Sequence, residues 1–144
     1  MPQPLVVWYS YAVVRVVPRV ERGEFLNVGV ILFARTARFL AACIDVDHAR
    51  LHAFAPDLDI ANIERHLAAF VAICEGVPEG GPIAQLPPSE RFHWLTAPRS
   101  AVIQPSPVHT GCTDDPRAAL DALCATLVRA HHTGVNREDA EGGN

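Results

Sequence analysis

Residues 24–34 read EFLNVGVILFA, and this stretch decides the fold because its composition is typical of a β-strand covered on both faces. Alternate side chains of a strand point to opposite faces. The sequence therefore predicts one face of Leu26, Val28, Val30 and Leu32, and another of Phe25, Asn27, Gly29, Ile31 and Phe33. Because both faces are largely apolar, we expect a central strand. Asn27 and Gly29 interrupt the second face, which indicates a bulge or the close approach of another backbone or of a ligand.

The neighbouring residues predict further strands on both sides of this stretch. Leu5–Val17, LVVWYSYAVVRVV, is rich in valine and aromatic residues, and Pro18–Gly23 supplies the turn of an antiparallel hairpin. Beyond the central strand, Arg38–Asp45 and Arg50–Phe54 are predicted as two more strands joined by turn residues.

The second half of the chain is predicted to contain two principal helices. Apolar residues at helical spacing indicate a helix within Asp57–Gly76, and Asp115 followed by Pro116 marks the start of another. Between the helices, Phe92–Leu95 and Ser100–Gln104 are expected as short strands.

The order of these elements predicts an α+β fold with a mainly antiparallel sheet of about five or six strands and two principal helices packed on it. The segments 77–90 and 105–114 contain several turn-forming residues and are expected to be irregular. We expect a single domain over residues 1–133, followed by a flexible tail at 134–144.

The composition indicates a folded protein without a membrane span or an export signal. Hydrophobic residues make up 49% of the 144 residues and charged residues 19%, which excludes disorder for most of the chain. The apolar runs are far shorter than the ~20 residues that a bilayer requires, and the N-terminus lacks the features of a signal peptide. We therefore expect a cytoplasmic protein whose four cysteines stay as thiols.

The charged residues exclude several functions. The basic residues are twelve arginines and no lysine, which rules out lysine chemistries such as Schiff bases and the P-loop. Residues 1–38 carry a net charge of +3 and residues 39–144 a net charge of −7. The total of −4 argues against general nucleic-acid binding, and leaves room only for a local basic patch near the N-terminus.

Three segments resemble a bacterial family catalogued as domain of unknown function 3037: Tyr11–Phe33, Glu90–Gly111 and Asp114–Val128. The specific part of the likeness is the GEFLNVGVI core of the first segment and the PRS…Q…H residues of the second. The resemblance implies a small bacterial protein without an assigned activity. It also implies a protein partner, with a HipA-like kinase encoded nearby as one candidate, and it supplies no catalytic residues.

Residues suited to an anion gather around the predicted hairpin turn. Arg19 and Arg22 could hold a phosphate or a carboxylate through forked hydrogen bonds, with Glu24 and Asn27 nearby. The alternative is a solvated hairpin tip in which arginine and glutamate pair with each other.

The segment Arg99–Thr110, RSAVIQPSPVHT, is the second candidate and the preferred one on chemistry alone. Its prolines stiffen the chain, and polar groups on a stiff loop form many binding sites. The polar residues concerned are Arg99, Ser100, Gln104, Ser106, His109 and Thr110. Equally, these side chains could satisfy the backbone groups of their own loop.

A sharper hypothesis joins the two surfaces in one anion pocket. Its members would be Arg19, Arg22, Arg99, Ser100 and His109, with Asn27 and Gly29 as the floor. Such a pocket requires the Cα atoms of Asn27 and Gln104 to lie within about 15 Å, since long side chains reach only ~6–7 Å each.

The sequence contains no complete catalytic or metal-binding signature. Ser100 and His109 lack a nucleophile elbow, and Cys112 beside His109 is more simply a loop thiol. His48 and His52 would suit a metal on a helix, but the strand predicted there would hold them ~13 Å apart. We therefore expect no metal and no cofactor, and we favour a binding protein over an enzyme.

Three classes of function follow, in order of preference. The first is an interaction or regulatory module that docks on a partner protein. The second is a binder of an anionic small molecule or nucleotide at Arg99–Thr110. The third is an enzyme that acts on a phosphate or nucleic-acid substrate.

Overall fold

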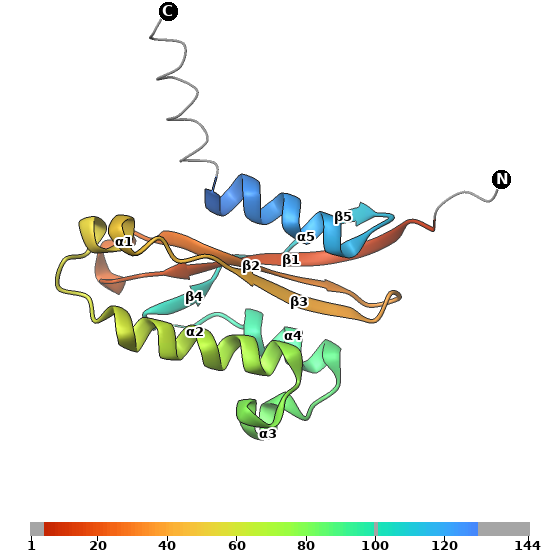
Figure 1. Ribbon diagram of the computed structural model, residues 1–144. Helices are drawn as coiled ribbons and strands as arrows, with labels where there is room; N and C mark the ends of the chain where they lie inside the picture. The colour runs from red at the N-terminus through yellow and green to blue at the C-terminus, as the bar shows by residue number, and fades with distance from the viewer. Residues whose placement is uncertain (1–4, 100, 130–144) are drawn as a thin grey trace, which may run out of the picture.

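β2, Leu26–Ala34, is an inner strand of the sheet, as the sequence predicts (Figure 1). The computed structural model of the chain describes residues 5–99 and 101–129. The sheet is antiparallel with the order β3-β2-β1-β4, and β5 pairs with the same strand, β1, that β4 pairs with. The other strands are β1 (Val7–Val16), β3 (Phe39–Ile44), β4 (Ile103–Pro105) and β5 (His109–Thr113).

Helices cover both faces of the sheet, which confirms the α+β fold (Figure 1). On one face lie α2 (Ile60–Glu75) and α4 (Pro88–Thr96). On the other lies α5 (Pro116–Cys124), which continues as the π-helical segment η3 (Ala125–Arg129). The shorter elements are η1 (Val20–Arg22), α1 (His48–Phe54), η2 (Pro78–Gly80) and α3 (Gly81–Ala84).

The two principal helices begin at predicted caps, and α2 also ends at the predicted glycine. Asp59 caps α2 by accepting a hydrogen bond from the backbone N–H of Asn62 at 3.1 Å, and Gly76 ends the helix with a φ of 72°. Asp115 caps α5 by accepting from the N–H of Ala118 at 3.2 Å.

Two hydrophobic clusters fill the space between the sheet and the helices on its two faces. The larger lies between the sheet and the α2–α4 layer and includes Ile31, Leu67 and Phe92. The smaller lies between the sheet and α5 and includes Leu32 and Leu120. β2 contributes to both clusters, which is why both of its faces are apolar.

A β-bulge in β2 corrects the predicted assignment of its faces. Val14 of β1 pairs with Gly29, but the next residue, Arg15, pairs with Asn27, so Val28 has no partner of its own on β1. One extra residue reverses the alternation of side chains beyond it.

The consequence is visible in the two clusters. Leu26 and Val28 pack in the larger cluster together with Ile31, whereas Val30 and Leu32 pack in the smaller one against α5. The prediction that Leu26, Val28, Val30 and Leu32 share one face was therefore wrong.

Two predicted strands are helices. Arg50–Phe54 belongs to α1, because the Asp47 carboxylate accepts a hydrogen bond from Arg50 N at 3.0 Å and so caps a helix start. Phe92–Leu95 belongs to α4, which begins at Pro88, a residue type suited to the first helical turn.

Two segments expected to be irregular contain regular structure. Residues 77–90 hold η2, α3 and the first turn of α4, and residues 105–114 hold β5. The predicted tail at 134–144 and Ser100 lie outside the described residues.

The expectation that all four cysteines are thiols was also wrong. Cys43 of β3 and Cys124 of α5 form a disulfide across a sequence separation of 81 residues. Cys74 and Cys112 are free, the first buried and the second exposed. The prediction rested on an expected compartment, which says nothing about which cysteines the fold brings together.

Candidate ligand pocket at the first hairpin

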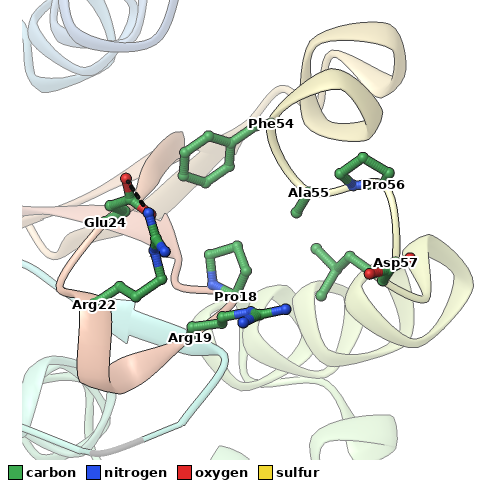
Figure 2. A pocket seen from close by; sticks show the side chains of 9 residues that line it. Pro18, Arg19, Arg22, Glu24, Phe54, Ala55, Pro56 and Asp57 are labelled. Atoms are coloured by element: carbon green, nitrogen blue, oxygen red, sulfur yellow. Dashed lines mark hydrogen bonds and ion pairs between the residues drawn. The ribbon is translucent and has the colours of Figure 1, made fainter.

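A cavity of about 470 Å³ opens between the β1–β2 hairpin loop and the segment that follows α1 (Figure 2). The hairpin contributes Pro18, Arg19, Arg22 and Glu24. The opposite wall comes from Phe54, Pro56, Asp57 and Leu58. Two stretches of chain about thirty residues apart are therefore brought together around one hollow.

The hairpin side is shaped by a tight turn. Pro18 follows the end of β1, and η1 closes when Gly23 N donates to Val20 O at 3.2 Å. Gly23 has a φ of 69°, the left-handed conformation that glycine adopts without steric cost. This turn places Arg19 and Arg22 at either end of a single short helical turn.

The opposite wall is held between two helices. α1 ends at Phe54, where Ala55 N donates to Leu51 O at 2.9 Å, and Leu58 N then donates to Ala55 O at 3.1 Å. Asp59 begins α2 directly afterwards. The backbone of this wall is thus fixed at both ends, which favours a pre-formed cavity.

The two arginines differ in their partners. Arg22 Nε donates to Glu24 Oε1 at 2.6 Å, and this pairing raises the pKa of Arg22 and lowers that of Glu24. Figure 2 shows Arg22 turned toward Glu24, whereas Arg19 extends below Pro18. Within the described part of the chain, the Arg19 guanidinium has no hydrogen bond or ion pair.

An anion placed beside Arg22 would therefore have to compete with the carboxylate of Glu24. Because its pKa is lowered, Glu24 stays ionised at neutral pH and releases Arg22 only as the pH falls through that lowered value. If a compound with an anionic group on an apolar ring, such as phenyl phosphate, binds in this cavity, Glu24→Gln should increase its affinity about threefold at pH 7, the scale of an exposed ion pair. Titration followed by NMR measures the change.

The matched control is Glu21→Gln, which removes the same charge from the same turn but breaks no hydrogen bond of Arg22. It should change the affinity less than Glu24→Gln does. Equal gains in the two variants would contradict a specific competition and indicate only a change in local charge.

Asn27 and Gly29 have contacts within the protein. Asn27 Nδ2 donates to the Leu127 carbonyl at 3.1 Å, which ties β2 to the end of the α5 layer. A Cβ on Gly29 would lie 2.5 Å from Ile44 Cδ1 and 2.6 Å from Cys43 O, so β3 fills the space beside this glycine. Of the three readings of this interruption, the structure shows two, a bulge between Asn27 and Gly29 and the close approach of β3 to Gly29.

Arg99 and Gln104 make contacts with residues close to them in the sequence. The Arg99 guanidinium donates to the carbonyls of Trp94 and Ala97, lies over the Trp94 ring, and has a pKa lowered by burial. Gln104 Nε2 donates to Ala101 O at 2.8 Å. Gln104 therefore binds a backbone group of its own loop, whereas Arg99 binds carbonyls at the end of α4.

Ser106 and His109 lie along β1. Ser106 is buried, its Oγ accepts from Val13 N at 2.8 Å, and its own N–H donates to Val13 O at 2.8 Å. His109 pairs with Tyr11 in register, and their rings are 5.3 Å apart.

The structure thus groups only part of the predicted site. The cavity takes in Arg19, Arg22 and Glu24, but its lining includes none of Asn27, Gly29, Arg99, Gln104 and His109. Asn27 and Gln104 both pair with Arg15, on opposite edges of β1, so their Cα atoms lie about 10 Å apart. The distance condition for a joint pocket is met, yet the amide N–H groups of Asn27 and Gln104 donate to Leu127 and Ala101 instead.

The residues that sequence reasoning missed are the wall from Phe54 to Leu58. Two signals could have found it. Asp47 is a residue type that caps a helix start, and Pro56 cannot continue a helix. Both would have replaced the predicted strand by a short helix with a turn after it.

The histidine and cysteine candidates are also placed by the fold. His48 and His52 lie on α1, so the argument from strand spacing was wrong, but His48 is paired with Glu64 at 2.7 Å. Over the described ranges, no group of three or more metal-ligating side chains is found. His109 and Cys112 lie three residues apart on β5, which turns their side chains to opposite faces.

The fold and the cavity define a small α+β domain with a polar, partly aromatic pocket beside its first hairpin. A family model described as Protein of unknown function (DUF3037) matches residues 11–128, and the chain belongs to that family. No curated protein and no solved structure matches the chain. Among the described residues, no helix combines the length and the apolar character that crossing a membrane requires.

Proposed function

We propose that this protein binds a small molecule that carries one anionic group, a phosphate or a carboxylate, on an apolar body. The observation that carries the proposal is Arg19, a guanidinium at the wall of the cavity with no partner among the described residues. Arginine binds phosphates and carboxylates through paired N–H groups, and it keeps its charge at all physiological pH values.

The remaining walls supply the apolar contacts. Phe54 is partly exposed at the end of α1, and Pro18, Pro56 and Leu58 surround the hollow with hydrocarbon. A volume of about 470 Å³ falls within the range of small-molecule sites. The geometry therefore suits a ring or a short apolar group beside an anionic head.

The acidic residues of the same cavity limit the charge of the ligand. Glu24 already neutralises Arg22, and Asp57 adds a second carboxylate to the lining. A polyanion such as a nucleic-acid backbone would meet both carboxylates. This arrangement, together with the net charge of −4, favours a ligand of low charge.

The proposal is tested with phenyl phosphate, inorganic phosphate and phenol as probes. We expect phenyl phosphate to bind most tightly, because it alone engages both Arg19 and the apolar wall. Backbone NMR shifts should concentrate at residues 18–24 and 54–58. Arg19→Ala should weaken phenyl phosphate about tenfold, the scale of one charge-assisted hydrogen bond.

Arg35→Ala is the matched control, since Arg35 is exposed and follows the opposite end of β2, about 30 Å away. It removes one positive charge and should leave the affinity unchanged. Equal weakening by both variants, or shifts confined to other residues, would overturn the proposed site.

A protein partner is the second proposal. It is favoured by exposed apolar side chains at the start of β1, where Leu5, Val6 and Trp8 are 86%, 65% and 71% exposed. Such residues are common at protein interfaces when they gather in one place. Affinity purification from the native host separates the two proposals, since a stoichiometric protein supports this one and a co-purified small anion supports the first.

A further inference from the structure

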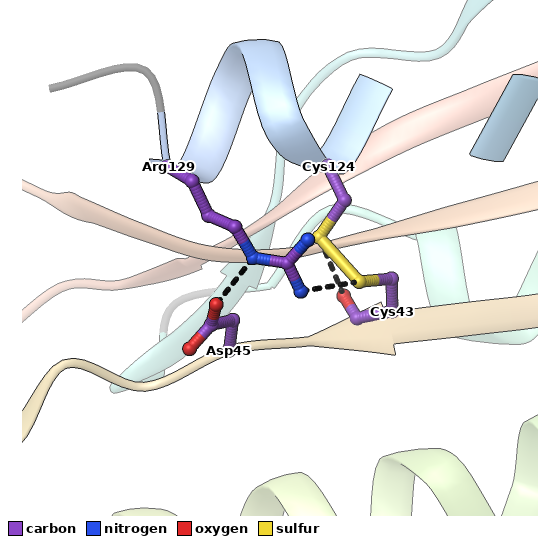
Figure 3. The surroundings of a disulfide bond; sticks show 4 residues. All are labelled: Cys43, Asp45, Cys124 and Arg129. Atoms are coloured by element: carbon purple, nitrogen blue, oxygen red, sulfur yellow. Dashed lines mark hydrogen bonds and ion pairs between the residues drawn. A yellow bond between two sulfur atoms is a disulfide. The ribbon is translucent and has the colours of Figure 1, made fainter. Parts of the chain in front are cut away.

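The disulfide joins the outer strand of the sheet to the helix above it. Cys43 lies on β3 and Cys124 ends α5, with their Cα atoms 6.4 Å apart, a separation that suits a disulfide (Figure 3). The same region is joined by two polar contacts: Arg129 to Asp45, and Asn27 to the Leu127 carbonyl. The end of the α5 layer is therefore held to the sheet in three ways.

The two sulfur atoms have different surroundings. Cys124 is fully buried in the smaller cluster, whereas Cys43 is partly exposed. Figure 3 shows the Arg129 side chain lying over the pair, and its Nη2 atom is 3.6 Å from Cys43 Sγ. A guanidinium beside a sulfur favours the thiolate, which is the nucleophilic form in thiol–disulfide exchange.

Each sulfur also has a partner available after reduction. A Cys43 thiolate would accept from Arg129, which is already in place. A Cys124 thiol would have the Cys43 carbonyl oxygen at 3.8 Å as its acceptor. Leu120, Cys124 and Val128 would remain buried against β2, so α5 does not depend on the disulfide alone for its position.

We propose that Cys43 and Cys124 form a reversible redox pair in which Cys43 is the reactive residue and Cys124 the resolving one. The oxidant is a low-molecular-weight disulfide of the glutathione class. The Cys43 thiolate attacks one sulfur of that disulfide, forms a mixed disulfide and expels one thiolate.

The second step closes the pair. Cys124 attacks Cys43 Sγ, and its proton passes to the second small thiolate, which leaves as a thiol. Two protein thiols are oxidised to one disulfide, one external disulfide is reduced to two thiols, and no other reactant is needed. Reversal by the same small thiol begins with attack at Cys43, the less buried of the two residues.

Of the two free cysteines, Cys74 serves as an internal reference and Cys112 is removed by mutation. Burial raises the pKa of the Cys74 thiol to about 12, so it stays protonated and unreactive at neutral pH. Cys112 is exposed on β5 and would itself react with oxidised glutathione, so the experiment below uses a Cys112→Ser background.

The test treats reduced Cys124→Ser and reduced Cys43→Ser with oxidised glutathione at pH 7.5. We expect Cys124→Ser to accumulate a mixed disulfide at Cys43 about ten times faster than Cys43→Ser forms one at Cys124, since Cys43 lies beside the Arg129 guanidinium and is the less buried residue. Intact-mass and peptide mass spectrometry follow both reactions. Equal rates, or faster modification of Cys124, would overturn the assignment of roles.

Arg129→Gln tests the role of the guanidinium, and Arg117→Gln on α5 is its matched control, because Arg117 lies over the Phe39 ring instead. In the Cys124→Ser background, Arg129→Gln should slow modification of Cys43 several-fold, and Arg117→Gln should not. Circular dichroism confirms that each variant is folded. A chain that retains both thiols in oxidising glutathione buffer would contradict the redox pair itself.

Discussion

Gly29→Val is expected to lower the free energy of unfolding by about 3 kcal/mol, the upper part of the range for overpacking a tight interior site. A Cβ at this position would lie 2.5 Å from Ile44 Cδ1 and 2.6 Å from the Cys43 carbonyl oxygen. A side-chain atom can rotate away, but a carbonyl that belongs to the β2–β3 ladder can move only with its strand. Urea denaturation measures the loss.

Gly23→Ala is the control for this variant. A Cβ on Gly23 meets nothing within 4 Å, but its φ of 69° is unfavourable for alanine, so the expected cost is about 1 kcal/mol. If Gly29→Val cost no more than Gly23→Ala, the close approach of β3 would not be the reason for the glycine. Urea denaturation needs no ligand, so its result does not depend on whether the proposed pocket binds one.

Ile31→Ala is expected to cost about 4 kcal/mol, within the range for truncating a fully buried aliphatic side chain. Ile31 has no exposed surface, and its neighbours in register are Ala12 on β1 and Ala42 on β3. Truncation would leave three alanines in a row across the sheet. The space facing α2 could then be filled only by movement of the helix, so a cavity would remain.

Val108→Ala is the matched control, because Val108 is 44% exposed and loses little burial when it is shortened. Its cost should stay within about 0.5 kcal/mol. A loss below 1.5 kcal/mol for Ile31→Ala would mean that the layers above and below β2 repack freely around the missing atoms. Thermal and urea unfolding of the two variants provide the comparison.

The central position of β2 was predictable because a strand covered twice must be apolar on both faces. The bulge was not predictable in the same way, because one added residue changes the direction of every later side chain without changing the composition. Asn27 and Gly29 marked its place, but a bulge and a bound ligand leave the same residues in the sequence. Only the pairing of Arg15 with Asn27 decides between them.

Short elements were the ones most easily mistaken. α1 has seven residues, too few to show a helical period, and its strongest signal is the single cap at Asp47. β5, HTGCT, contains a glycine and few strand-forming residues, and it is a strand because β1 offers it an open edge. In both cases tertiary contacts outweigh local preference.

In the candidate site, too, residues close together in the sequence were predictable and those brought together by the fold were not. Arg19, Arg22 and Glu24 lie within six residues, so the sequence alone could group them and predict the pairing of Arg22 with Glu24. Their opposite wall begins thirty residues later and depends on how α1 turns back toward the hairpin. The Arg99–Thr110 segment has equally suitable residue types, but its groups are used in contacts that no composition reveals.

β1 meets two short strands in succession along one edge, and Ser106 occupies the junction between them. β5 pairs with Val7–Tyr11, β4 pairs with Val14–Val16, and the Ser106 hydroxyl and amide bind Val13 in the interval. A hydroxyl thus takes the place of a main-chain acceptor where the ladder changes from one strand to the next. Without it, the Val13 N–H would lose its acceptor at a buried point of β1, which is the cost of leaving a main-chain donor unsatisfied inside a protein.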